Sequence, residues 1–330
     1  MQPPPPRLGF DNYALRALGW KARQLLDYAA ALKLDAVLFS DFDVYESLAD
    51  DALRELKHRA DDLGIKLYAG MLSICPSSVI FDARRGSAAE QLRLCLRIAK
   101  LLGSPVARCV LGKVEDRRSA GGIAARIDET LAVLRTVRSE AMDAGIKIAV
   151  ENHAGDMQAW ELATLIEAAG KDYVGANLDS GNAAWTLEDP LENLEILGPY
   201  TLTTSLRDSM IWESANGATI QWTAMGEGCV DLKAYFKRFA ELCPHAPVII
   251  ETISGRPIFL PMLRDFFWDA YPRAKPQTLA SMLRLARGGE PRELFNPPVG
   301  EDGHRATEQH QLAELERSVR HCRKVFGELL

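Results

Sequence analysis

Three carboxylates stand at the ends of strand-like segments that are far apart in the sequence. Glu151 lies near the end of Ile146–His153, whose apolar, β-branched residues are typical of a buried strand. Asp179 and Glu251 follow two later apolar runs, in VGANLDSGN and APVIIETIS. In one pocket, three carboxylates would repel one another unless arginines or a cation were close. The pattern predicts one acidic site, and its oxygen donors favour a hard divalent ion such as Mn²⁺ or Mg²⁺.

Further polar residues near these strand ends are candidates for substrate binding. Alternate side chains of a strand share a face, so His153 should point the same way as Glu151. Arg207 and Arg256 could bind a substrate carboxylate or hydroxyl groups, because a guanidinium offers paired donors. For Arg207, an ion pair with a neighbouring aspartate is an equally simple explanation.

The segments between these residues indicate how the carboxylates could meet. About eight strand-like runs alternate with helical segments from about residue 8 to residue 254. This alternation predicts parallel strands and an α/β fold. Eight repeats favour a (β/α)₈ TIM barrel, in which the polar residues at the carboxyl ends of the strands share one pocket. A doubly wound open sheet is the alternative, but the Gly-rich turn after the first strand is missing.

Other segments depart from the alternation. Residues 211–224 carry an Asn216-Gly217 turn signal between two β-like arms and predict a hairpin. The chain should divide into a barrel at 1–256 and, at 257–330, a C-terminal helical extension packed on the barrel or in a subunit interface. Within the extension we expect helices at 259–272, 278–289 and 307–329, and a polar, mobile loop at 296–306. In the barrel, residues 123–145 should form one long helix.

Composition limits the partners of the chain. Its 330 residues carry a formal net charge of −6, which gives no basic surface for nucleic acid or for a membrane. Because a long apolar run and an apolar leader are both missing, we expect a soluble cytoplasmic protein. The six cysteines lack C-x-x-C spacing and are expected to be reduced core thiols. A small carbohydrate-type molecule is the expected partner, and homo-oligomer formation is left open.

Five short motifs occur in order along these strand ends. They are Glu-Asn-His at 151–153, Leu-Asp-Ser-Gly-Asn at 178–182, Leu-Arg-Asp at 206–208, Gly-Glu-Gly at 226–228 with Val-Asp at 230–231, and Ile-Glu-Thr at 250–252. Together they resemble the xylose-isomerase-like superfamily of sugar phosphate isomerases and epimerases. The resemblance implies that Glu151, Asp179 and Glu251 bind a divalent metal. It further implies that the two glutamates act as acid and base, and Asn182 stands where many members carry a substrate-binding histidine.

The sequence departs from this family at one expected metal ligand. Many members have a His-x-Lys-Asp pattern on the seventh strand, and here Ser205 opens the matching run Ser-Leu-Arg-Asp. A neutral hydroxyl is a poor metal ligand, so either water or another donor would complete the coordination. Gln221 in the hairpin is the favoured candidate because an amide oxygen suits the same ions, and certain related dehydroshikimate dehydratases are similar in using a glutamine. Core packing beside Trp222 would also explain Gln221.

Such a site could catalyse several reactions. A cation that binds a carbonyl and an adjacent hydroxyl stabilises an enediolate while a carboxylate removes the neighbouring proton. Return of the proton predicts an isomerase or epimerase acting on a sugar or a sugar-derived oxo compound. Loss of CO₂ or a β-hydroxyl from the same enolate gives a lyase instead, a decarboxylase or dehydratase, and the missing histidine adds weight to this alternative. An abasic-site endonuclease, which would need more metal-binding histidines, and a non-catalytic sugar-binding barrel are the remaining hypotheses.

Overall fold

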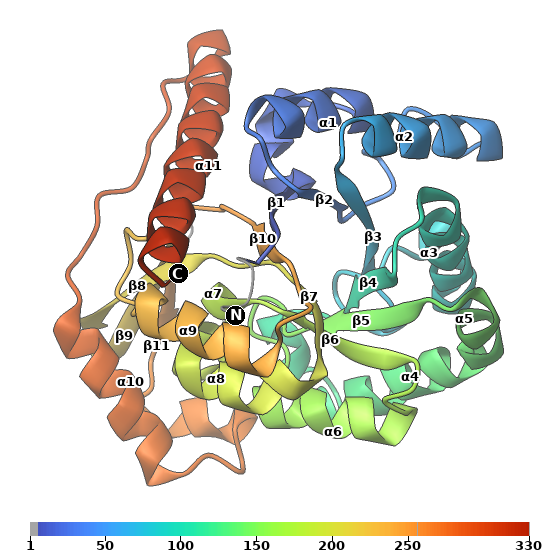
Figure 1. The fold of residues 1–330 in the computed structure, drawn as a ribbon. Helices are drawn as coiled ribbons and strands as arrows, with labels where there is room; N and C mark the ends of the chain where they lie inside the picture. Colours follow the sequence, from blue (N-terminus) through green and yellow to red (C-terminus); the bar gives the residue numbers. More distant parts are fainter. Residues whose placement is uncertain (1–5, 256, 330) are drawn as a thin grey trace.

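The computed structural model of the chain describes residues 6–255 and 257–329, and its centre is an eight-stranded parallel sheet (Figure 1). In spatial order the strands are β10 (Val248–Ile250), β1 (Leu8–Asp11), β2 (Ala36–Phe39), β3 (Lys66–Ser73), β4 (Val106–Val110), β5 (Lys147–Glu151), β6 (Val174–Leu178) and β7 (Thr201–Thr204). A parallel bridge between Leu206 and Ile250 brings the chain after β7 back to β10. The fold is therefore the expected (β/α)₈ TIM barrel with a C-terminal helix.

Helices surround this barrel and cover the outer faces of its strands (Figure 1). They are α1 (Ala22–Ala31), α2 (Asp50–Asp62), α3 (Ala88–Leu102), α4 (Gly122–Thr136), α5 (Arg138–Ala144), α6 (Ala159–Ala169), α8 (Pro190–Leu197) and α9 (Leu232–Leu242). Local signals set their ends: the Ser87 hydroxyl accepts a hydrogen bond from the Glu90 N–H at the start of α3, and Gly103 ends this helix with φ 64°. Inside the barrel, a small apolar cluster that includes Leu38 and Tyr68 fills the space between the strands.

The segment 123–145 is two helices, so the prediction of one long helix is wrong. Val137 separates α4 from α5 with φ −106° and ψ 8°, outside the helical region. The side chain of Val137 is buried in the core. The break allows α4 to pack against α6 while α5 packs against α3, which a straight helix of this length could not do on the curved surface of a barrel.

The predicted hairpin forms between β8 (Asp208–Ser214) and β9 (Gly217–Thr223), and Asn216 in its turn has φ 68°. A further strand, β11 (Pro257–Leu260), pairs antiparallel with the other edge of β9. This strand and a 3-10 helix (η6, Asp265–Ala270) occupy the segment expected to be a helix at 259–272. That prediction is wrong because the edge of β9 offers main-chain partners to the residues around Phe259 and Leu260, which pair as a strand instead.

The rest of the extension is α10 (Pro276–Gly288), which confirms the helix expected at 278–289, and the long helix α11 (Glu301–Leu329). The start of α11 lies inside the segment 296–306 that was predicted to be a loop, so this part of the prediction is wrong. Leu315, Val319 and Phe326 of α11 belong to the same apolar core as the barrel helices. The domain boundary expected after residue 256 stays a prediction. β11, which lies beyond this boundary, pairs with β9, which lies before it.

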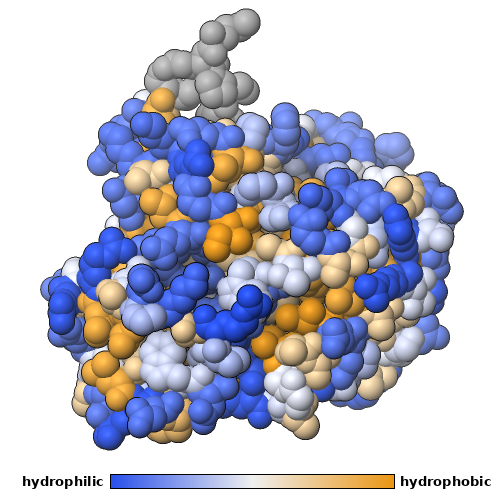
Figure 2. All heavy atoms as spheres, turned by 90° about the horizontal axis from the view of Figure 1, so that it is seen from below, coloured by the Kyte–Doolittle hydropathy of each residue, from blue (hydrophilic) through white to orange (hydrophobic). Residues whose placement is uncertain are grey.

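The surface and the cysteines agree with the composition. Figure 2 shows one face of the molecule, on which hydrophilic side chains surround smaller areas of apolar surface. Within residues 6–255 and 257–329, no helix is both long and apolar enough to cross a membrane. All six cysteines are free thiols, and only Cys229 is partly accessible, as expected for reduced core residues.

The close approach of β1 and β2 gives a test of the barrel. A Cβ atom added at Gly9 would lie 2.3 Å from the Ala36 carbonyl oxygen, which belongs to the paired strand. We expect Gly9→Ala to lower the free energy of unfolding by about 2 to 3 kcal/mol in urea titrations, because the backbone must shift. The control is Gly288→Ala at the end of α10, where the added methyl group meets open space and should change stability by less than about 1 kcal/mol. Equal stability of the two variants would contradict this packing.

Candidate active site

A cavity of about 800 Å³ opens at the carboxyl ends of the barrel strands. Its wall includes residues that follow β1, β2, β4, β5, β7 and β10, among them Tyr13, Asp41, Lys113, His153, Arg207 and Glu251. Trp185 and Trp222 stack on each other at one side, with ring centroids 4.1 Å apart and planes 9° from parallel. Catalytic side chains of TIM barrels collect at this end because the loops after the strands meet there. The cavity is therefore the candidate active site.

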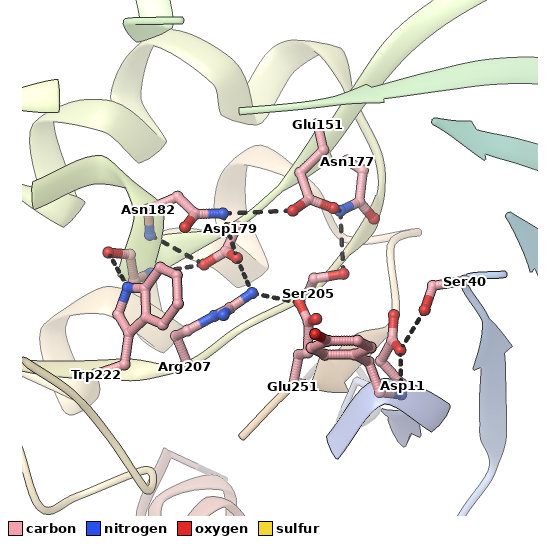
Figure 3. Close-up of polar contacts among 12 residues, drawn as sticks. Asp11, Ser40, Glu151, Asn177, Asp179, Asn182, Ser205, Arg207, Trp222 and Glu251 are labelled. Carbon is pink, nitrogen blue, oxygen red and sulfur yellow. Dashed lines mark hydrogen bonds and ion pairs between the residues drawn. The ribbon is translucent and has the colours of Figure 1, made fainter. Parts of the chain in front are cut away.

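The structure brings Glu151, Asp179 and Glu251 together beneath this cavity (Figure 3). Glu151 is the last residue of β5, Asp179 directly follows β6, and Glu251 directly follows β10. One carboxylate oxygen from each residue lies within 4.8 Å of the others, and all three side chains are buried. Neighbouring parallel strands end at the same rim, which is why residues up to a hundred positions apart meet here.

Two buried arginines hold these carboxylates. Arg108 on β4 donates from Nε to Glu151 Oε2 at 2.7 Å, makes a second bond to the same oxygen, and donates to the Met71 carbonyl oxygen. Arg207, which follows β7, donates from one nitrogen to both Asp179 and Glu251. Its guanidinium also lies over the ring of Trp222, 4.4 Å from the centroid, a cation–π contact that is strong when desolvated. Arg207 thus bridges two carboxylates, and its ion pair with Asp179 is the alternative that the sequence offered. Its binding of a substrate stays a prediction.

Three asparagine side chains complete the hydrogen bonds within the acidic cluster. Asn177 on β6 donates to Glu151 Oε2 at 2.6 Å, and Asn182 donates to Asp179 Oδ2 at 2.6 Å and to Glu151 Oε1 at 3.3 Å. Asn152 donates to the Asp179 carbonyl oxygen and accepts from the Asp179 N–H, which fixes the backbone at the end of β6. The structure places Asn182 between two carboxylates, and its binding of a substrate stays a prediction.

Ser205 and Gln221 occupy different places relative to the carboxylates. Ser205 follows β7 and accepts a hydrogen bond from Asn177 Nδ2 at 3.1 Å, so it lies beside Glu151 (Figure 3). Gln221 lies on β9 and lines a separate, smaller cavity. Because strand side chains alternate, Trp222 faces the candidate active site and Gln221 faces away from it. The structure therefore does not bring Gln221 to the acidic cluster.

The two other predicted substrate-binding residues can be assessed separately. His153 lines the cavity, and its Nδ1 lies 2.6 Å from the Gly112 carbonyl oxygen. Burial, and then the charge of Arg108, lowers the pKa of His153 to about 4, so the imidazole is neutral at physiological pH. Nδ1 then carries the proton that Gly112 accepts, which leaves Nε2 as an acceptor. Arg256 lies outside the described residues.

The buried cluster contains more negative than positive charge. Its carboxylates are those of Asp11, Glu151, Asp179 and Glu251, and its guanidiniums are those of Arg108 and Arg207. With all four carboxyl groups ionised, four against two would leave an excess of two negative charges among these described residues. Burial raises the pKa of Asp11, Asp179 and Glu251, and a neighbouring carboxylate raises each further, although the guanidiniums act in the opposite direction. A divalent cation would match this excess, and the oxygen donors are of the type that hard cations prefer.

The Gly-Glu-Gly motif has a structural explanation in the chain after β9. The carboxylate of Asp208 accepts hydrogen bonds from the N–H groups of Gly226, Gly228 and Val230. A Cβ atom at Gly228 would lie 2.2 Å from an Asp208 carboxylate oxygen, so only glycine fits. The motif therefore ties the loop after β9 to the residue next to Arg207.

Sequence reasoning missed Arg108 and Asn177. Arg108 lies in the middle of the apolar run VARCV, and a charged residue inside a buried strand is a signal of a functional or structural charge pair. Asn177 lies in VGANL and could have been found in the same way. Their partners could not have been identified, because this requires the strand register.

Comparisons with known proteins agree with this geometry. Residues 26–280 match the family model described as xylose isomerase-like TIM barrel. A curated relative, 3-oxo-isoapionate decarboxylase of Pectobacterium atrosepticum, is 26% identical over 196 residues, which cover 59% of this chain. The match spans 64% of the length of that relative.

Solved structures share the fold at lower sequence identity. The IOLI protein with a bound zinc atom is 16% identical, with a TM-score of 0.60 over 85% of this chain and 99% of that one. An L-ribulose 3-epimerase is 15% identical, with a TM-score of 0.60 over 97% of this chain and 96% of that one. At such identities the likeness shows the fold.

The pairing of Arg108 with Glu151 can be tested by a double-mutant cycle. Arg108→Met leaves a buried carboxylate without its charge partner and should cost about 3 to 5 kcal/mol of unfolding free energy. The double variant Arg108→Met/Glu151→Gln should cost at least about 1 kcal/mol less than the sum of the two single variants, because the unpaired charge is removed as well. Urea unfolding at neutral pH measures all four proteins. Additive costs would show that the two side chains are not coupled.

Proposed function

The chain belongs to the xylose isomerase-like TIM-barrel family, and on this basis we propose that it is a divalent-metal-dependent enzyme. Its substrate is a sugar or a sugar-derived oxo compound, which it converts through an enediolate or enolate. One observation carries this proposal: Glu151, Asp179 and Glu251 converge within 4.8 Å beside a cavity of about 800 Å³. A cavity of this volume accommodates a small carbohydrate.

Glu151, Asp179 and Glu251 would hold the cation. A divalent ion supplies a positive charge that polarises a substrate carbonyl and stabilises the negative charge of an enolate. The excess of two negative charges that the fully ionised cluster would carry supports such an ion. Mn²⁺ and Mg²⁺ are the ions we propose, because every donor of the triad is an oxygen.

The other side chains bind the substrate and move its protons. Glu251 lines the cavity and can therefore reach a carbon-bound proton of the substrate. Glu151, which accepts hydrogen bonds from Arg108, is the second carboxylate for proton transfer. His153 offers its Nε2 as an acceptor for a substrate hydroxyl, and the stacked Trp185 and Trp222 provide an apolar wall that limits the access of water.

Two reactions fit these roles. In an isomerase or epimerase, one glutamate removes a proton and a carboxylate returns it to the neighbouring carbon or to the opposite face. The second candidate is decarboxylation of a 3-oxo sugar acid, favoured by the similarity to 3-oxo-isoapionate decarboxylase and by Ser205 in place of the usual histidine. In that reaction the bond between the α-carbon and the carboxylate breaks. CO₂ leaves, the bonding electron pair stays behind as the enolate, and a glutamate needs only to protonate the carbon. Release of CO₂ from 3-oxo-isoapionate distinguishes the two.

The first functional test concerns the two glutamates. Glu151→Gln and Glu251→Gln should each slow solvent-deuterium exchange at the α-carbon of ketose or 3-oxo acid substrates by at least about 100-fold, because the proton acceptor is lost. Circular dichroism should show an intact fold. Glu195→Gln on the outer surface of α8 is the control and should exchange at the wild-type rate. Wild-type exchange in both active-site variants would refute the proposed roles.

The second test concerns the cation and the guanidinium that shares its ligands. Arg207 donates to oxygens of Asp179 and Glu251, so its charge opposes a cation at the same place. Arg207→Met should bind Mn²⁺ at least about tenfold more tightly, or by about 1.4 kcal/mol, in calorimetric titrations of chelator-treated protein. Arg207→Lys retains the charge and should change the affinity less. Weaker binding by Arg207→Met would mean that the guanidinium assembles the ligands, contrary to this view.

A further inference from the structure

A divalent cation held by Glu151, Asp179 and Glu251 needs further oxygen donors, because hard cations take about six ligands. The two side chains that the sequence offered do not supply one. Ser205 is a neutral hydroxyl that accepts a hydrogen bond from Asn177, and Gln221 lines the smaller cavity on the other side of β9. A further protein ligand must therefore come from another residue beside the carboxylates.

Two asparagines beside these carboxylates have an amide oxygen without a partner. Asn177 and Asn182 are both buried, and the Oδ1 atom of each accepts no hydrogen bond from the described residues. Asn152 differs, because both polar atoms of its amide bond to the main chain of Asp179. An amide oxygen suits the same hard cations as a carboxylate oxygen. Asn177 and Asn182 are therefore the two candidates.

Their contacts distinguish the two asparagines. Asn182 Nδ2 lies 2.6 Å from Asp179 Oδ2 and 3.3 Å from Glu151 Oε1, so its amide group lies beside two of the three carboxylates (Figure 3). Asn177 Nδ2 donates to Glu151 and to Ser205. Asn182 is thus the asparagine whose amide group reaches the place where the carboxylates of β5 and β6 meet.

The spacing at Asn182 is that of neighbouring metal ligands. Oxygen atoms about 2.1 Å from an octahedral cation lie about 3.0 Å from each other. The two distances from Asn182 Nδ2 to the carboxylate oxygens, 2.6 and 3.3 Å, lie on either side of this value. An oxygen atom in the place of Asn182 Nδ2 would therefore be a neighbour of both carboxylates in one coordination shell.

A half-turn of the amide exchanges its oxygen and its nitrogen, which have nearly the same size. Carboxylates alone attract the N–H groups of an amide, whereas a cation between them attracts its oxygen. The turn breaks no hydrogen bond of Oδ1, which has no partner among the described residues. The main chain can stay in place, because the Asn182 N–H donates to Asp179 Oδ1 at 3.1 Å at the start of α7 (Ser180–Ala183).

We propose that Asn182 binds the divalent cation through Oδ1, together with Glu151, Asp179 and Glu251. It supplies the protein ligand that many family members take from the histidine which Ser205 replaces here. This role differs from the substrate contact that the position of Asn182 in the family implies. The assignment rests on the proposed metal-dependent function and names a further ligand of the same site.

Mn²⁺ titrations of the chelator-treated protein distinguish a ligand from a hydrogen-bond donor. Asn182→Leu removes the amide and keeps a similar volume. If Asn182 is a ligand, this variant should bind Mn²⁺ at least about tenfold more weakly. If Asn182 only donated hydrogen bonds to Asp179 and Glu151, its removal would free these carboxylates, and the affinity would stay the same or rise. The two roles thus predict opposite changes.

Asn177→Leu is the matched control. Asn177 is equally buried, has the same unpartnered oxygen and also donates to Glu151, so its loss should leave Mn²⁺ affinity within about twofold of the wild type or raise it. Asn182→Asp keeps an oxygen ligand and adds a negative charge. It should bind Mn²⁺ at least as tightly as the wild type. Circular dichroism should show that all three variants are folded.

The wild-type protein gives a direct measurement that needs no variant. In crystals grown with MnCl₂, one atom of the Asn182 amide should lie within about 2.5 Å of the anomalous manganese peak. Because an amide nitrogen has only donors to offer, this distance would identify the atom as Oδ1.

Two results would overturn the role of Asn182 and leave the metal site intact. One is a manganese peak at the three carboxylates with the Asn182 amide more than about 3.5 Å away, beyond any coordination distance. The other is Mn²⁺ binding by Asn182→Leu that equals or exceeds that of the wild type. Failure of the wild-type protein to bind Mn²⁺ would instead refute the cation itself, and with it this ligand.

Discussion

The structure depends on the burial of negative charge at the mouth of the barrel. Four carboxylates share this space with two guanidiniums, and an ionised group is costly to bury unless it is paired. Arg108 and Arg207 each hold part of the cluster, and Asn177 and Asn182 donate to the remaining oxygens. Even so, the fully ionised cluster would keep two negative charges uncompensated, and the pKa values of Asp11, Asp179 and Glu251 are raised by burial and by neighbouring carboxylates. That imbalance is the physical reason for assigning a divalent cation to it, and it connects the fold to the proposed chemistry.

The local pattern of the sequence was sufficient for the barrel and for the convergence of its carboxylates. Strands and helices can be recognised from the spacing of their apolar residues, and Glu151 and Asp179 stand at the ends of apolar strand segments. Where tertiary contacts decide, sequence reasoning failed: β11 forms because β9 offers an edge, and α4 and α5 separate at Val137 to follow the curved barrel. The partners of Arg108 depend on strand register. The side to which Gln221 points depends on how the hairpin is oriented on the barrel. Neither can be read from spacing.

The hairpin inserted after β7 gives this barrel features of its own. Its second strand, β9, presents Trp222 to Arg207 on one side and Gln221 and Thr223 to a second cavity on the other. Asp208 and the Gly-Glu-Gly motif fix the loop that follows β9. The guanidinium of Arg207 is thus positioned by the hairpin as well as by Asp179 and Glu251.

A crystal structure of the protein grown with MnCl₂, with data collected at the manganese absorption edge, would show whether the three carboxylates bind a divalent cation. We expect one strong anomalous peak contacted by carboxylate oxygens of Glu151, Asp179 and Glu251. A map with no peak among these three residues at saturating Mn²⁺, with Arg207 alone bridging Asp179 and Glu251, would contradict it.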